Sequence, residues 1–221
     1  MKAIGKFALA FFALVCVCSA QTANKTQGNR AILWSPPDFG WPEDLQQATV
    51  PKEMIRSFKV GDLPIILEET KLEDVRRLFG GTIGSQGDAS EAVAWLCLHG
   101  SDASGKWMLW LTSGELEGSI YIDGIQWRRL SSNERPDRRC ASLPVNKAGI
   151  ALPIALHPGM KRQEVMQVLG RPTEAHGGML IYFHEHQETI HNEPYSVDNT
   201  IGFSLRGDAV REIDVNRVTA D

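Results

Sequence analysis

The sequence predicts an α+β fold of two tandem repeats, each a short helical segment packed on a small antiparallel sheet. Four dissimilar segments recur in the same order about ninety residues apart, each copy contains one short amphipathic stretch, and apolar residues alternate along the segments that follow it. The 221-residue chain is 43% hydrophobic and 23% charged, as in globular proteins. Its net charge of −4 argues against a nucleic-acid-binding protein, which would carry a basic surface.

Residues 1–20 are typical of a secretory signal peptide. Lys2 and Lys6 precede an apolar run over 7–17, and small residues stand directly before Gln21. The run is too short to cross a bilayer as a helix. We therefore expect cleavage before Gln21, a mature chain without a membrane span, and a periplasmic or secreted location.

The two cysteines of the leader raise the question of a lipid anchor. Val15 precedes Cys16, and Val17 precedes Cys18. Lipoprotein signals need a small residue just before the acylated cysteine, so we expect simple cleavage and no attached lipid. A lipid anchor despite this sequence is the alternative.

Cys97 and Cys140 are the cysteines that remain after the leader. An oxidising compartment permits a disulfide between them. Two cysteines without Cys-x-x-Cys spacing do not form a structural zinc site on their own. We predict a Cys97–Cys140 disulfide that pins the connection between the copies onto the first sheet. Two unpaired thiols, with Cys97 buried as a small apolar residue, are the alternative.

The internal repeat sets the expected domain organisation. The recurring pairs are 63–67 with 152–156, 73–80 with 163–170, 95–99 with 180–184, and 110–116 with 203–210. We therefore divide the chain into a signal peptide (1–20), an extended proline-marked N-terminal arm (21–56), repeat 1 (57–130), a linker (131–147) and repeat 2 (148–221).

Each copy is expected to contain one short helix. Val75, Leu78 and Phe79 share one face of the first, and Val165, Val168 and Leu169 share one face of the second. Thr70 with Glu73 fits a capping box, and Gly80 and Gly170 stand where a helix-ending glycine belongs.

Strands are expected after each helix, because apolar and polar residues alternate there. They span 93–99, 107–112 and 117–127 in the first copy, and 178–187 and 199–215 in the second. The glycine-containing segments 113–115 and 206–208 predict hairpin turns.

The segment 159–173, GMKRQEVMQVLGRPT, resembles the opening motif of the SmpA/OmlA/BamE-like family of small bacterial envelope proteins. The likeness covers 148–218 well and 60–128 more loosely, and Lys161 stands where the family has a capping threonine. The β-lactamase inhibitory protein has a similar unit in tandem. The resemblance implies that two such units can join into one concave sheet, and that the function is binding to proteins.

His184-Glu185-His186 is the one metal-like cluster in the sequence. On a strand His184 and His186 point to the same side, so both could reach one ion. A third ligand would have to come from His191, Glu188 or His176. Two ligands at this spacing form a weak pattern, and no Gly-x-Ser-x-Gly motif is present, so we expect no cofactor, no metal and no catalytic residue.

Aromatic residues and histidines suggest a binding face. Strand alternation puts Leu96, Leu98, Ile181 and Phe183 under the helices. The opposite face then carries Trp95, Cys97, His99, Tyr182, His184 and His186, with Trp110 and Tyr121 joining it. Such a surface is typical of protein interfaces. Coverage of this face by the N-terminal arm or the linker is the alternative.

We therefore expect an exported, non-enzymatic protein-binding module that acts as an envelope assembly factor or an inhibitor-like binder. Its partner is another protein in the envelope or the extracellular space, with no nucleic acid involved. The partner-binding residues are Trp95, His99, Trp110, Tyr121, Tyr182, His184 and His186. The alternative is a metal-binding protein or metal-dependent enzyme that uses His184 and His186.

Overall fold

The antiparallel pairing expected from the sequence is present, but one large sheet dominates a mostly β fold, where a small sheet was expected in each repeat. The computed structural model describes residues 30–42, 55–87, 92–114, 118, 120–144 and 149–220. The fold is mostly β, since 54% of the described residues are in strands and 10% are in helices. The expected signal peptide, its cleavage site and the leader cysteines lie outside the described residues. Within them, no helix is both long and apolar enough to cross a membrane.

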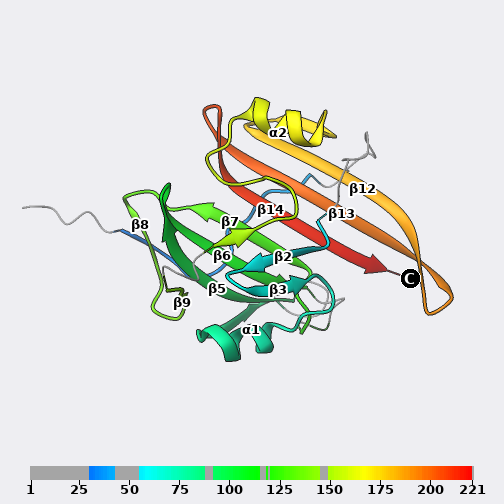
Figure 1. Cartoon of the computed structure of the whole chain (residues 1–221), viewed down its shortest axis with the longest axis horizontal. Coiled ribbons are helices and arrows are strands. Elements are labelled where there is room, and N and C mark those ends of the chain that lie inside the picture. Colours follow the sequence, from blue (N-terminus) through cyan, green and yellow to red (C-terminus); the bar gives the residue numbers. More distant parts are fainter. Residues whose placement is uncertain are drawn as a thin grey trace, which may run out of the picture.

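The main sheet has nine strands and joins the two halves of the chain (Figure 1). Its order is β11 (Glu174–His176), β12 (Met179–Ile190), β13 (Glu193–Arg206), β14 (Ala209–Ala220), β7 (Gly124–Arg129), β6 (Gly105–Ser113), β5 (Val93–Asp102) and β4 (Ile83–Gln86), with β9 (Ala141–Ser142) also pairing β5. β14 and β7 pair antiparallel, with Val215 opposite Ile125. Strands that lie far apart in sequence therefore share one continuous sheet.

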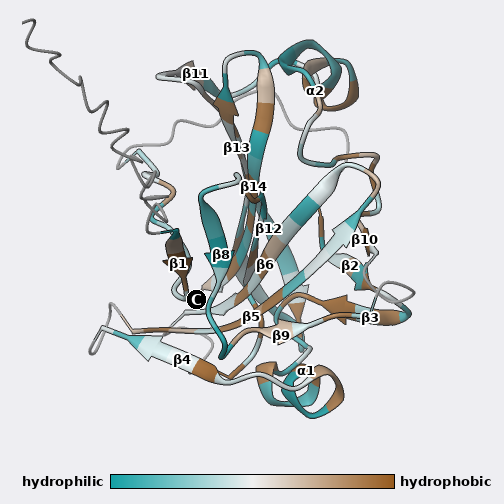
Figure 2. Ribbon diagram, turned by 90° about the vertical axis from the view of Figure 1, so that its left-hand side faces the viewer, coloured by the Kyte–Doolittle hydropathy of each residue, from teal (hydrophilic) through white to brown (hydrophobic). Residues whose placement is uncertain are grey.

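Different layers cover the two faces of this sheet (Figure 2). One face, here called the helix side, carries α1 (Leu72–Phe79), α2 (Arg162–Leu169) and a three-stranded sheet of β10 (Ile150–Ala151), β2 (Ser57–Val60) and β3 (Leu63–Ile66). The other face, the arm side, carries β1 (Ala31–Leu33), which pairs in parallel with β8 (Glu134–Pro136).

One row of apolar side chains runs across the helix side of the sheet. Directly paired residues point to the same face, and the row is Leu96, Leu111, Ile125, Val215, Ile201 and Tyr182. All six are buried in one core cluster, together with Val75 of α1 and Val165 of α2. This row is the base on which both helices pack.

The row corrects one prediction. We expected Tyr182, His184 and His186 on the face opposite Leu96, but all three point to the helix side. The Tyr182 hydroxyl donates a hydrogen bond to the Gly170 carbonyl at the end of α2, at 3.1 Å. Leu180, Ile181, Tyr182 and Phe183 are all apolar, so alternation alone cannot tell which pair faces the helices, and docking on α2 decides it.

Both helices end as predicted, but α1 begins differently. Gly80 and Gly170 close them with positive φ angles of 84° and 87°, a conformation that favours glycine. The capping box expected at Thr70 is wrong, because the Thr70 hydroxyl accepts from the Ile66 amide at 2.9 Å and the N-cap is Lys71.

The buried face of α1 differs from the prediction at one residue. Leu78 is 58% exposed, whereas Leu72 and Val75 are buried and Phe79 packs at the edge of the core. The buried stripe of α1 therefore consists of Leu72, Val75 and Phe79, without the expected Leu78. In α2 the expected stripe is correct, since Val165 and Leu169 are buried and Val168 packs against the core.

Two hairpins shape the second half of the sheet. The turn expected at 206–208 is confirmed, since Arg206 pairs with Ala209 across Gly207, whose φ is 65°. The β12–β13 hairpin closes at His191 and Asn192, which have positive φ angles of 53° and 71°, as a two-residue turn of type I′ requires. The expected turn at 113–115 lies partly outside the described residues.

Candidate functional site

The residues predicted to bind a partner lie in several separate environments. Trp95 and Trp110 are buried on the arm side, with exposures of 3% and 0%, and Tyr182 is buried on the helix side. These three therefore present no open surface. His184 and His186 are half-buried on the helix side, away from the tryptophans.

The N-terminal arm covers the tryptophans. The Trp34 ring packs edge-on against Trp95 with centroids 5.7 Å apart. The Trp110 indole donates a hydrogen bond to the Trp34 carbonyl at 2.9 Å, and the Arg139 guanidinium lies 3.9 Å from the Trp34 ring. The face that carries Trp95 and Trp110 was expected either to be open to a partner or to be covered by the arm or the linker. The described residues show that the arm and the linker cover it.

The disulfide between Cys97 and Cys140 is confirmed. It joins Cα atoms 4.8 Å apart and belongs to the same arm-side cluster as Trp95 and Trp110. Ala141 and Ser142 then pair alongside β5. The disulfide and this pairing hold the linker against the first half of the sheet, as the sequence predicted.

His99 shares the arm side of β5 with Trp95, whereas Tyr121 lies apart from the other candidates. His99 is half-buried opposite Met108, and burial, with repulsion from Lys106, lowers its pKa. The Lys71 ammonium lies 5.3 Å from the centre of the Tyr121 ring, in the bridge that precedes α1. Neither residue lies on a surface shared with His184.

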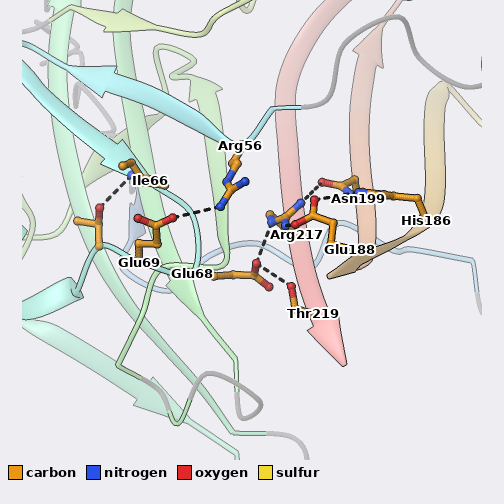
Figure 3. Close-up of polar contacts among 10 residues, drawn as sticks. Arg56, Ile66, Glu68, Glu69, His186, Glu188, Asn199, Arg217 and Thr219 are labelled. Carbon is orange, nitrogen blue, oxygen red and sulfur yellow. Dashed lines mark hydrogen bonds and ion pairs between the residues drawn. The ribbon is translucent and has the colours of Figure 1, made fainter. Parts of the chain in front are cut away.

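A second group of polar side chains gathers around Arg217 on the helix side (Figure 3). This Arg217 cluster consists of Glu68, His186, Glu188, Asn199, Arg217 and Thr219. Arg217 donates to Glu68 at 2.8 Å and to Glu188 at 2.9 Å. Its side chain is only 4% exposed, so two carboxylates neutralise a buried guanidinium.

Strand register brings these residues together. His186 and Glu188 are alternate residues of β12, so they point to the same face. Asn199 and Arg217 are paired across β13 and β14 on that face. Glu68 follows β3, and its φ of 64° is unusual for a residue other than glycine. Its amide donates to the Ile122 carbonyl at 2.6 Å, which fixes the turn that presents the carboxylate.

The electrostatics of the cluster favour a fixed arrangement. Burial tends to raise the pKa of Glu188, but hydrogen bonds from His186 and Arg217 hold it below its ordinary value. Burial and repulsion from His186 lower the pKa of His184. The Glu188 carboxylate therefore stays charged between His186 and Arg217.

A cleft of about 730 Å³ opens beside the cluster. Glu68, Glu188 and Arg217 form its buried side, and Arg56, Glu69, His191 and Tyr195 contribute to its rim. Arg56 and Glu69 form an exposed ion pair at 3.2 Å. The cleft is thus polar, carries both signs of charge, and lies between the β3–α1 turn and the β12–β13 hairpin.

The histidines of the metal-binding alternative are arranged for other contacts. The His184 and His186 rings are stacked with centroids 5.2 Å apart, and the His186 Nε2 lies 2.9 Å from a Glu188 oxygen. His191 lies in the hairpin turn, and the side chain of His176 is outside the described set. Across the part of the chain that the structure describes, no three histidine, cysteine or acidic side chains group to hold a metal ion.

Sequence reasoning found His184 and His186 but missed Arg217, Asn199 and Glu68. The sequence held one indication of Arg217, which alternates with Ile213 and Val215 and therefore points toward the core.

No protein-family model, curated protein or solved structure matched this chain in our comparisons.

Proposed function

We propose that this protein is an exported, non-enzymatic protein-binding module, and that a charged segment of its partner enters the cleft beside the Arg217 cluster. One observation carries the proposal: a buried arginine, fixed by two carboxylates, forms one side of an open cleft of about 730 Å³. Polar groups that are already ordered lose little entropy on binding, which favours affinity.

The rim of the cleft supports a protein as the ligand. Tyr195 is half-buried there, and Arg56 and Glu69 offer both charges to an incoming chain. Tyrosine and arginine are enriched at protein interfaces. The partner is a protein of the envelope or the extracellular space, and the role is assembly or inhibition.

We further propose that the chain arose as two tandem repeats related to SmpA/OmlA/BamE-like units. The parallels between α1 and α2 support this: each has eight residues and each ends at a glycine of positive φ. Lys71 and Lys161 precede them, and each forms an isolated bridge to a later segment, at Tyr121 and Ala209.

Affinity capture from envelope extract, with three forms of the protein as bait, tests the function. We expect one partner that wild type retains, that Arg56→Glu loses because the rim charge is reversed, and that Arg171→Glu keeps. Arg171 is a matched control, being an exposed arginine that does not line the cleft. Binding to the purified partner would then be measured for each form.

Two results would contradict the proposal. One is a partner whose affinity is the same for wild type and Arg56→Glu, because the cleft would then not be the binding site. The other is one tightly held metal ion per chain that His186→Ala removes, which would favour the metal-binding alternative through His184 and His186.

A further inference from the structure

A second cavity, of about 440 Å³, lies on the arm side between the N-terminal arm and the sheet. The arm contributes Asp38, Phe39 and Trp41 to its lining, and the sheet contributes Asp214. No lining residue belongs to the Arg217 cluster. This arm-side pocket is therefore a separate feature of the molecule.

Two carboxyl groups without a cationic side-chain partner in the described structure line this pocket. Asp123 and Asp214 are 6% and 5% exposed, and neither forms an ion pair within the described part of the chain. Asp123 accepts a hydrogen bond from the Gly114 amide at 2.5 Å, and Asp214 accepts one from the Gln126 side chain at 2.8 Å. Among the described residues that line the cavity there is no lysine, arginine or histidine, so its ionisable groups are all acidic.

The amide side chains add further acceptors. The Gln126 Oε1 and the Asn216 Oδ1 are buried, and neither has a hydrogen-bond partner in the described structure. An unpartnered buried acceptor costs free energy that an incoming donor recovers. The groups still unused around the cavity are therefore acceptors, and they match a ligand that only donates.

Two aromatic rings close the pocket from the arm. Phe39 and Trp41 pack with centroids 4.6 Å apart over Gly202. A Cβ at Gly202 would lie 2.4 Å from the Phe39 ring, so only glycine leaves room for this packing. Aromatic faces attract organic cations, and apolar rings suit an alkyl chain better than a bare metal ion.

We propose that the arm-side pocket binds a small organic amine through its primary ammonium group. The ammonium is a compact charge with three donors and no acceptor, which matches the Asp123 and Asp214 carboxylates and the nearby amide oxygens. Its alkyl chain lies against Phe39 and Trp41. Burial raises the pKa of both carboxyls, and a neighbouring ammonium would favour their charged forms.

Calorimetric titration of the purified protein with pentylamine near neutral pH tests this inference. We expect saturable binding that Asp214→Asn weakens about tenfold or more, because the substitution removes the charge and keeps the shape. Asp208→Asn is the matched control, since Asp208 is exposed in the β13–β14 turn. It should bind as wild type does, and 1-pentanol, which lacks the ammonium, should not bind.

Asp214→Asn is expected to fold, because it removes a buried charge, and a thermal unfolding curve verifies this before titration. Three results would overturn the inference: no saturable binding of pentylamine, equal binding by wild type and a folded Asp214→Asn, or binding of calcium ions in place of the amine. Since the Arg217 cluster is untouched, each result leaves the proposed partner binding to be judged by its own test.

Discussion

At the scale of single residues, two carboxylate partners allow the charged side chain of Arg217 to be buried. A charge removed from water is tolerated only where opposite charges and hydrogen bonds replace hydration. Arg217 contacts Glu68, Glu188 and Asn199, so its guanidinium is well compensated. The compensation is mutual, because Glu68 and Glu188 depend on the same cation.

Replacing Arg217 by methionine should therefore destabilise the protein strongly. The substitution keeps the bulk but leaves two partly buried carboxylates without their cation, which costs about 3–5 kcal/mol. Urea unfolding of wild type and Arg217→Met measures the difference. Arg56→Met is the control, because the exposed Arg56–Glu69 pair should contribute about 1 kcal/mol or less. Equal effects of the two substitutions would show that Arg217 is not a structural centre.

Asp123 predicts a dependence of stability on pH. Burial raises its pKa from 3.8 to about 6, so the folded state holds this proton more tightly than the unfolded chain does. The stabilisation from protonated Asp123 is fully present below the pKa of the unfolded chain. It is lost as pH rises through the pKa of the folded state, between about pH 4 and 6. Stability should therefore fall over this window because of Asp123.

Asp123→Asn removes this titration. Relative to wild type, the variant should gain about 3 kcal/mol between pH 4 and pH 7. Guanidinium unfolding of both proteins at several pH values gives the comparison. A constant difference across the window would mean that Asp123 titrates normally in the folded state.

At the scale of elements, sequence analysis succeeded where signals are local. Gly80 and Gly170 end helices, and Gly207 makes a hairpin turn, because the left-handed backbone favours glycine wherever it occurs. It failed at Tyr182, since every residue from Leu180 to Phe183 is apolar and both faces of the strand are buried there. The orientation of Tyr182 follows from packing against α2, a contact between separate elements that no local pattern shows.

The candidate site was less predictable than the fold. His184 and His186 stood out as residue types, but the partners that define their surroundings, Glu68 and Arg217, come from other strands and turns. Coverage of Trp95 by Trp34 likewise joins segments that no local pattern connects. Contacts of this kind follow from register and topology, which a single sequence specifies only through the complete fold.

Gly202 offers a test of how the arm is held. Gly202→Ala would place a methyl group 2.4 Å from the Phe39 ring and 2.6 Å from Trp41, so the rings must move away from the sheet. We expect a red-shifted tryptophan emission and faster proteolysis near Trp41, while the far-ultraviolet circular dichroism stays unchanged. Gly149→Ala is the control, because nothing lies within 4 Å of its added Cβ. Identical emission from both variants would mean that the rings do not depend on Gly202.

At the scale of the whole molecule, the seam between β14 and β7 determines cooperativity. The apolar row from Leu96 to Tyr182 crosses this seam without interruption, and both helices pack on the same core cluster. Unfolding one half would expose the buried face of the other. The two halves of the sheet should therefore unfold together.

Thermal unfolding should show one transition with equal calorimetric and van't Hoff enthalpies. The chain supplies a useful pair of probes, because all six tryptophans, of which Trp127 is the last, precede the second half. Trp41 lies over Gly202 of the second half, whereas Trp95, Trp107 and Trp110 lie on β5 and β6. Tryptophan emission is thus weighted toward the first half, and far-ultraviolet circular dichroism reports on both. Midpoints that differ between the two probes would show that the halves unfold separately.

The position of β1 also constrains the order in which the chain can fold. Trp34 rests on Trp110, 76 residues later, and β1 pairs with β8 later still. Ribosomes deliver the N-terminus first, at about 5–20 residues per second, so the aromatic arm waits several seconds before its docking surface has been synthesised. Of the described segments, the first to emerge is therefore among the last to pack against the sheet. During that interval Trp34, Phe39 and Trp41 depend on other molecules, or on dilution, to avoid premature association.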